Sequence, residues 1–386
     1  MSVGGFSGIA IRWRSMRFDL GEASGAMGDL GTFIPLVVSL IYVNHLDAGS
    51  ILLFAGLYNI LTGFLFNQPL PVQPMKAIAA VAIAESLSRG EIAAAGLGVG
   101  LVVFVLGATG LVETIERLVP RAIVRGIQLG VGLKLLLRGL AMILDQPALE
   151  PDGWVAAGVA GALVLVATRW RRFPSALILF GFGLVVMLMT QPGLLSKLQL
   201  GWNGFLVTLP SSAEWREGLL RGSIPQLPLT LLNSVIAICA LSTDLYPGRG
   251  IGTRPMAMSV GAMNLVGCWL GAMPMCHGAG GLAGQHRFGA RTGGSVVMLG
   301  AAKVVIAIAL GTSAAVLLAA YPVAILGLLL CFAGAELALP ARKISSRSDF
   351  FLVLLTAGGI LGANTLVGFL LDFGAALLIR VGSKRD

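Results

Sequence analysis

The chain consists largely of apolar runs that are long enough to cross a lipid bilayer, and this restricts its fold more than any other feature. A membrane-spanning helix needs about 18 or more mostly apolar residues, and runs of about that length recur between residues 23 and 379. Of the 386 residues, 56% are hydrophobic and only 12% are charged. A soluble domain carries about twice that charged fraction. The sequence therefore predicts an all-α polytopic membrane protein.

Two short stretches interrupt the apolar pattern with glycine, proline and polar side chains. They are NQPLPVQPMK at 67–76 and PMCHGAGGLAGQHRFGARTG at 274–293. Hydrocarbon offers no hydrogen bonds to the backbone, so irregular backbone at membrane depth is tolerated only inside protein or beside a water-filled cavity. We expect each stretch to be an extended piece followed by a short half-helix, at about 74–88 and about 280–288. Together they are predicted to form a solute-binding site.

Counting both broken stretches as passes gives 14 transmembrane segments, seven in each half of the chain. An odd number of passes orients the two halves oppositely in the bilayer, which is the inverted-repeat plan of many transporters. The broken stretches are then segments 3 and 10, the third of each half, and this correspondence points to a binding site. The predicted parts are a flank at 1–22, a first repeat at 23–190, a connecting loop at 191–223, a second repeat at 224–380 and a tail at 381–386.

The distribution of charge predicts the orientation of the chain. Its 27 Lys and Arg residues outnumber its 18 Asp and Glu residues, for a formal net charge of +9. Basic clusters at 117–125, 169–172, 249–254, 287–291 and 342–347 all fall on one side under this pass count. By the positive-inside rule both termini are cytoplasmic, in a plasma membrane or a bacterial inner membrane. Because the basic residues mark the ends of apolar runs, no nucleic-acid partner is expected.

No cofactor, metal site or catalytic centre is expected from the sequence. Cys276 and His277 are neighbours, but no further metal ligands cluster with them. The sequence has no HExxH, GxSxG or Walker motif and no paired acids at helical spacing, so an enzyme is not expected. An anion channel and a sensor that transports nothing are the alternatives from other classes.

Four segments together resemble the molybdate transporter family of the sulfate permease superfamily. The likeness covers nearly the whole chain, and it implies core and gate domains like those of uracil permease. It also implies uptake of molybdate, with sulfate or a similar oxyanion as the alternative, and no C-terminal regulatory domain. The expected partners are the oxyanion and the lipid bilayer, and a homodimer is left open. The segments are GAMGDLGTFIPL at 25–36, PLPVQPMKAIAAVAIAE at 69–85, PQLPLTLLNSVIAICALSTDLYP at 225–247 and the stretch at 274–293.

Two facing half-helix N-termini would supply the chemistry that a buried anion needs. Each offers about half a positive charge and several free N–H groups. The macrodipoles contribute about 0.3 to 2 kcal/mol each, far less than the tens of kcal/mol that desolvating a buried anion costs. With about four to six hydrogen bonds of about 1.5 to 3 kcal/mol each, micromolar binding (about −8 kcal/mol) becomes plausible. A tetrahedral oxyanion can accept that many.

Three polar side chains of the broken stretches each have more than one interpretation. Gln73 either donates its amide to the solute or caps the short helix. His277 donates to the anion, titrates as part of ion coupling, or packs as a structural histidine. Lys76 lies in a first helical turn, where a cation opposes the helix dipole. It is either compensated by an anion or carboxylate, or it snorkels or pairs internally.

Glycines and one asparagine complete the predicted substrate site. The glycines after His277 allow close approach of the ligand to the backbone, with helix packing as the alternative. Asn233 stands where proton-coupled relatives carry an acid, and an amide can donate to an oxyanion but cannot carry a proton. The predicted substrate-binding residues are Gln73, Pro74, Met75, Lys76, Asn233, His277, Gly278, Ala279, Gly280 and Gly281.

A second group of residues is predicted to take part in ion coupling or charge pairing. Asp29 lies inside the first span, where an ionisable residue is a functional candidate. It either orients Lys76, carries a coupling proton, or pairs structurally with a cation. Arg287 is expected mainly as an anchor at the cytoplasmic end, with a role in the site as the alternative. The coupling or pairing candidates are Asp29, Thr32, Gln226, Gln285 and Arg287.

Overall fold

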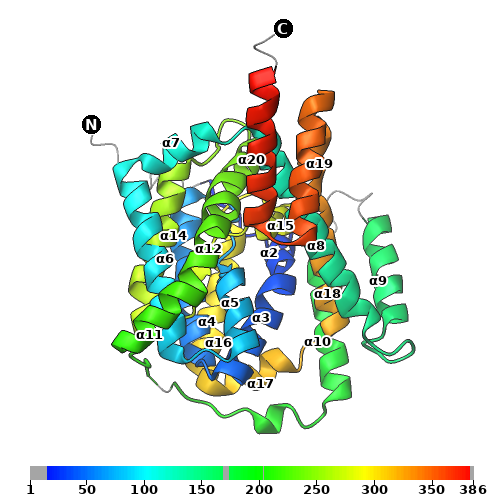
Figure 1. Cartoon of the computed structure of the whole chain (residues 1–386). Coiled ribbons are helices and arrows are strands. Elements are labelled where there is room, and N and C mark those ends of the chain that lie inside the picture. The colour runs from blue at the N-terminus through cyan, green and yellow to red at the C-terminus, as the bar shows by residue number, and fades with distance from the viewer. Residues whose placement is uncertain (1–14, 168–173, 203, 383–386) are drawn as a thin grey trace.

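The computed structural model describes residues 15–167, 174–202 and 204–382, most of them in helices (Figure 1). Residues 1–14 of the predicted flank, the basic cluster at 169–172, and residues 383–386 of the predicted tail lie outside the described residues. Seven helices of the described part are long and apolar enough to cross a membrane, by length and composition. The prediction of a mostly helical chain with several apolar helices of membrane-spanning length is confirmed. The count of 14 segments in two inverted repeats stays a prediction.

The first half of the chain contains nine helices, one 3-10 turn and one short strand among the described residues. They are α2 (Leu20–Ala26), η1 (Met27–Asp29), α3 (Leu30–Asn44), α4 (Ala48–Phe66), β1 (Gln73–Pro74), α5 (Lys76–Glu85), α6 (Arg89–Thr109), α7 (Leu111–Leu118), α8 (Arg121–Leu144), α9 (Trp154–Ala167) and α10 (Ser175–Thr190). Helices α2 and α3 are joined by η1 into one continuous helix.

The second half follows a long connection and is again mainly helical. Its elements are η2 (Leu195–Lys197), α11 (Ser212–Glu217), the π-helical η3 (Gly218–Ser223), α12 (Ile224–Leu229), the π-helical η4 (Thr230–Ala237), α13 (Ile238–Leu245), α14 (Thr253–Gly267), η5 (Cys268–Leu270), β2 (Met275–Cys276), α15 (Ala279–Arg287), α16 (Gly294–Leu310), η6 (Gly311–Ser313), α17 (Ala314–Ala319), α18 (Val323–Ala338), η7 (Leu339–Lys343), α19 (Arg347–Gly362) and α20 (Thr365–Gly382).

Both broken stretches have the predicted form of an extended piece followed by a short helix. Strands β1 and β2 pair antiparallel, with Gln73 opposite Cys276 and Pro74 opposite Met275. The first half-helix was expected from about residue 74, but it begins at Lys76. The chain stays extended there because Pro74 belongs to the strand pair and the Met75 N–H donates to the Pro274 carbonyl at 2.9 Å.

The connecting loop predicted at 191–223 ends earlier in the structure, because a helix begins at Ser212. A continuous helix runs from Ser212 to Leu245. It begins with a capping box, in which the Ser211 and Glu214 side chains each bond the other's backbone N–H. Pro228 lies inside the helix without ending it. Two π-helical segments flank the proline-containing turn, and their wider turns accommodate the missing proline N–H.

Another predicted span divides in two. The run expected as one helix over 92–115 ends at Thr109, and Gly110 adopts a left-handed conformation with φ of 78°. The next helix, α7, carries Glu113, Glu116 and Arg117 and lies at one end of the molecule (Figure 1). A left-handed residue ends the hydrogen-bond ladder of a helix, which is why the span stops here.

The helices pack as close pairs that use glycine at their crossing points. Helix α4 packs chiefly on α16, α6 on α14, and α8 on α18 and α19. A Cβ atom on Gly56 would lie 2.6 Å from the Gly300 carbonyl oxygen, and one on Gly300 would lie 2.5 Å from the Gly56 oxygen. Small residues at such contacts allow membrane helices to gain dispersion energy through close approach.

Candidate functional site

Both half-helices, α5 and α15, lie in the interior of the molecule (Figure 1), and each begins just after one strand of the antiparallel pair. Because β1 and β2 are antiparallel, α5 and α15 leave the pair in opposite directions with their N-termini next to it. The half-helix N-termini are therefore brought together from positions about two hundred residues apart in sequence, since Gln73 lies opposite Cys276. Helix N-termini carry partial positive charge and free N–H groups, so this pair is suited to an anion.

Gln73 places a free amide nitrogen at the start of α15. The side chain is completely buried, with 0% exposure. Its Oε1 accepts a hydrogen bond from Lys76 Nζ at 3.1 Å, whereas Nε2 has no partner among the described residues. A Cβ atom on Gly278 would collide with Nε2, so this position requires glycine. The Gln73 side chain therefore leaves Nε2 as a buried donor beside the N-terminus of α15.

The N-terminus of α15 keeps two free backbone donors. Gly278 caps the helix, and its carbonyl accepts from Gly281 N at 3.1 Å and from Leu282 N at 3.3 Å. In the part of the chain that the structure describes, the N–H groups of Ala279 and Gly280 have no hydrogen-bond partner. Such buried donors are costly unless a ligand or water satisfies them.

The N-terminus of α5 differs, because a side chain already fills it. Gln226 Oε1 accepts hydrogen bonds from Ala77 N at 2.8 Å and from Ile78 N at 3.2 Å. The other end of this amide donates to Thr230 Oγ1 at 2.9 Å. The predicted coupling candidate Gln226 is thus the cap of α5, and the two helix ends are not equivalent.

His277 is packed on both sides of its ring. Its Nδ1 is 2.8 Å from the Pro71 carbonyl oxygen and therefore donates, which leaves Nε2 to accept from Ser259 Oγ at 2.9 Å. The side chain has 0% exposure. This geometry corresponds to the structural interpretation of His277, in which the ring ties Pro71 of the first broken stretch and Ser259 of α14 to the second broken stretch. Ser259 carried no signal in the sequence, because its contact depends on the packing of α14.

Asp29 lies against the first turn of α15 with an unpaired carboxylate. It is 1% exposed, and neither oxygen has a hydrogen-bond partner within the described chain. A Cβ atom on Gly281 would collide with Oδ1. The charges of Lys303 and Lys76 both act on this carboxylate.

Lys303 on α16 is a functional candidate that was missed from the sequence. It is 4% exposed, its Nζ donates to Asn59 Oδ1 at 3.0 Å, and it lies 3.7 Å from the centroid of the Phe33 ring. The available signal was a single lysine within the apolar run GSVVMLGAAKVVIAIAL. An ionisable residue inside a span is a functional candidate by default.

The remaining predicted residues lie at different distances from this centre. Asn233 is buried on η4, and its Oδ1 has no partner among the described residues. Thr32 is buried on α3 just after η1. Gln285 is further along α15, where its Oε1 accepts from Ser295 Oγ at 3.3 Å. Arg287 ends α15, with its guanidinium carbon 5.8 Å from the Phe332 ring centroid. The structure therefore groups Asp29 with the two half-helix N-termini and places Arg287 outside that group.

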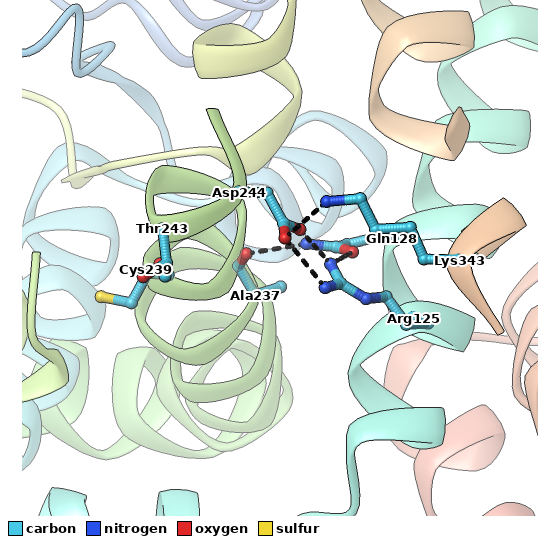
Figure 2. A network of polar contacts seen from close by, with 7 residues as sticks. All are labelled: Arg125, Gln128, Ala237, Cys239, Thr243, Asp244 and Lys343. Atoms are coloured by element: carbon cyan, nitrogen blue, oxygen red, sulfur yellow. Dashed lines mark hydrogen bonds and ion pairs between the residues drawn. The ribbon is translucent and has the colours of Figure 1, made fainter. Parts of the chain in front are cut away.

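A separate polar network lies at the basic side of the molecule, and Figure 2 shows it. We call it the Asp244 network. Asp244 on α13 forms ion pairs with Arg125 of α8 and with Lys343 of η7, the latter at 2.9 Å. Arg125 also donates to Gln128 Oε1 at 2.9 Å, and Gln128 Nε2 donates to the Ala237 carbonyl at 3.1 Å. The network therefore joins α8 and η7 to the helix that contains α13.

A membrane protein with two paired half-helices at its centre has the architecture of a secondary transporter. Its fold is similar to that of solute carrier 26 family member A9, with a TM-score of 0.62 and 13% identity over 94% of this chain and 65% of that one. It is also similar to the transmembrane domain of BicA, a cyanobacterial bicarbonate transporter, with a TM-score of 0.56 and 14% identity over 91% of this chain and 96% of that one. These likenesses show the fold.

The sequence comparisons identify the family. A family model described as a molybdate transporter of the MFS superfamily matches residues 21–135 and 218–337. Molybdate transporters 1 and 2 of Arabidopsis thaliana are each 41% identical to the chain. The alignments cover 92% of this chain and 86% of the first relative, and 90% of this chain and 84% of the second. The chain belongs to the molybdate transporter family, as the sequence motifs predicted. Its relatives are transporters and not enzymes.

Proposed function

We propose that the chain is a secondary active transporter of a tetrahedral oxyanion and that its solute is molybdate. The observation that carries this proposal is the set of buried, unpartnered donors at the start of α15. These donors are Gln73 Nε2 and the N–H groups of Ala279 and Gly280. Membership of the molybdate transporter family supports molybdate as the solute.

The oxyanion binds between β1 and the N-terminus of α15 in this proposal. Gln73 and the backbone of α15 donate hydrogen bonds, and Lys76, which is 3.1 Å from Gln73 Oε1, contributes a positive charge. The glycine positions keep the backbone accessible to the solute. Asn233 offers one further amide from η4, in the same continuous helix as the cap Gln226. His277 positions the second broken stretch instead of donating to the solute, because both of its ring nitrogens are engaged.

Transport in this proposal moves a core, which holds both half-helices, against a gate. The packing favours this division, since α4 packs on α16 and α6 on α14, whereas α18 and α19 pack on α8 and α20 packs on α19. Helix α18 also packs on α15 and α3, where the gate would meet the core. The basic side of the molecule is cytoplasmic, in a plasma or bacterial inner membrane. Each chain contains both half-helices, so the mechanism works in a monomer and equally in a homodimer.

Molybdate counterflow in proteoliposomes tests the proposal. Purified protein is reconstituted into vesicles loaded with unlabelled molybdate, and the entry of isotopically labelled molybdate is followed. We expect saturable exchange that external molybdate inhibits more strongly than sulfate does. Exchange that sulfate inhibits more strongly would make sulfate the solute. Unitary anion currents without saturable exchange would instead show an anion channel and overturn the proposal.

A further inference from the structure

The Asp29 carboxylate is buried beside the proposed oxyanion site without a partner for either oxygen. Among the described residues it is the only carboxylate with both oxygens in this condition. The other buried acids have partners: Glu22 accepts from Arg291 N at 3.0 Å, and Asp47 accepts from Ser50 N at 2.7 Å. An ionised carboxylate that is desolvated and unpaired is strongly disfavoured, so Asp29 needs a compensating cation or a proton.

The surroundings of Asp29 decide which cation it can take. The positive charges of Lys303 on α16 and Lys76 on α5 attract the Asp29 carboxylate. The Cys276 thiol of β2 is also close enough to interact electrostatically with Asp29. The two ammonium groups oppose a metal cation, which would also need several oxygen ligands. No group of three or more potential metal ligands occurs in the described part of the chain. A proton is the cation that a lone carboxylate can bind in this position.

Asp29 also competes with the oxyanion for the same positive groups. Its Oδ1 lies against Gly281, in the first turn of α15, so the ionised carboxylate offsets the positive end of that helix. It likewise offsets the charge of Lys76, which bonds the donor side chain Gln73. Adding a proton to Asp29 removes this negative charge and leaves the helix terminus and the lysines to the solute.

We propose that Asp29 is the group that binds the proton of a proton-coupled transport cycle. One proton adds to a carboxylate oxygen as the oxyanion binds and leaves that oxygen as the oxyanion is released, and no other bond changes. The inference rests on the proposed oxyanion site. It assigns the proton to Asp29, because Asn233, the amide of η4 in the proposed site, cannot titrate. Thermodynamic reciprocity then requires that the bound oxyanion also favours protonation of Asp29.

Lys303 is a positioning residue in this mechanism. Its ammonium group is fixed by Asn59 Oδ1 at 3.0 Å and by the Phe33 ring at 3.7 Å, and it is buried together with Asp29. It keeps the carboxylate ionisable in a site where burial alone would hold the proton permanently. The proton is released when the oxyanion leaves, because the two lysines then act on Asp29 alone.

The experiment compares the full-length protein with Asp29→Asn, which has nearly the shape of the protonated acid. Molybdate affinity is measured on purified protein between about pH 6 and about pH 8. For the unchanged protein, the apparent Kd should tighten by up to about tenfold per pH unit as the pH falls, the limit for one linked proton. The Asp29→Asn variant should bind molybdate with little dependence on pH.

Proton movement provides the second measurement. In vesicles with a trapped pH indicator, an inward molybdate gradient should acidify the interior with the unchanged protein. Asp29→Asn should lose this acidification while retaining molybdate counterflow. Asp145→Asn, a substitution of an exposed carboxylate in the loop after α8, is the matched control and should retain both.

Two outcomes would overturn the inference. One is molybdate-driven proton movement that persists in Asp29→Asn. The other is molybdate counterflow by the unchanged protein without proton movement and without any dependence of molybdate affinity on pH. This second outcome does not depend on whether a variant folds. A failure of the unchanged protein to exchange molybdate would instead overturn the proposed function.

Discussion

Gln73 has an amide nitrogen that is completely buried and has no partner within the described chain. Gln73→Ala should therefore weaken molybdate binding by about 10- to 100-fold, the value of one hydrogen bond to a charged group. The variant should still insert in the membrane, because the β1–β2 pairing uses backbone groups. Isothermal titration of purified protein measures the effect.

The control for this measurement is Gln191→Ala, since Gln191 is an exposed residue at the end of α10. Its affinity should equal that of the unchanged protein. Equal affinities of Gln73→Ala and the control would remove Gln73 from the site.

Gln226 is predicted to stabilise α5 rather than to bind the solute directly. Gln226→Ala would leave the N–H groups of Ala77 and Ile78 without their acceptor in a buried position. Each unsatisfied buried donor costs about 1 to 3 kcal/mol, so the variant should unfold several degrees lower in a thermal scan in detergent. Gln146→Ala removes a long local bond of 3.5 Å to the Met142 carbonyl and should leave the scan unchanged. A normal scan for Gln226→Ala would contradict its role as a cap.

At the scale of elements, the Asp244 network ties α13 to α8 and η7 (Figure 2). If α13 moves with the core and α8 belongs to the gate, the network must open during each cycle. Asp244→Asn removes both ion pairs, each worth about 1 kcal/mol or less because Arg125 and Lys343 retain contact with water. We therefore expect a shift of about fivefold toward the state in which this face is open.

Cys239 reports on this shift, because it lies on the same helix as Asp244 and is 3% exposed. A membrane-impermeant maleimide added at the basic face should label Cys239 several-fold faster in Asp244→Asn than in the unchanged protein. Asp145→Asn serves as the control, since Asp145 is exposed and is not among the ion pairs of the described residues. Unchanged labelling of Cys239 would argue against a network that opens during transport.

The elements differ in how far the sequence predicts them. Proline and glycine mark both broken stretches, because these residues restrict the backbone directly. The start of α11 was missed because Glu214, Arg216 and Glu217 resemble a loop, although Ser211 and Glu214 form a capping box. The contacts that decide the site, such as Lys303 with Asn59, join residues 244 positions apart. They depend on tertiary packing, and a single sequence holds no record of it.

At the scale of the whole molecule, the two faces differ in charge. Helix α19 begins and α20 ends near the top of the molecule in Figure 1, and the long connection from α10 to α11 crosses the bottom. Arg347 is the first residue of α19, and Lys343 ends η7 shortly before it. Positively charged loops remain in the cytoplasm during membrane insertion. The connection at the bottom is therefore predicted to be outside the cell, and the start of α19 inside.

Single cysteines placed on the two faces test this orientation. Ser196 and Ser348 are exposed, the first in the connection after α10 and the second at the start of α19. Intact cells that express Ser196→Cys should react with a membrane-impermeant maleimide, whereas Ser348→Cys should react only after permeabilisation. The native thiols give little background, because three of the four are buried and Cys331 is only partly accessible. The reverse labelling pattern would contradict this orientation, because it would place the Asp244 network outside the cell. The half-helix site would then open to the cytoplasm on the face opposite the Asp244 network.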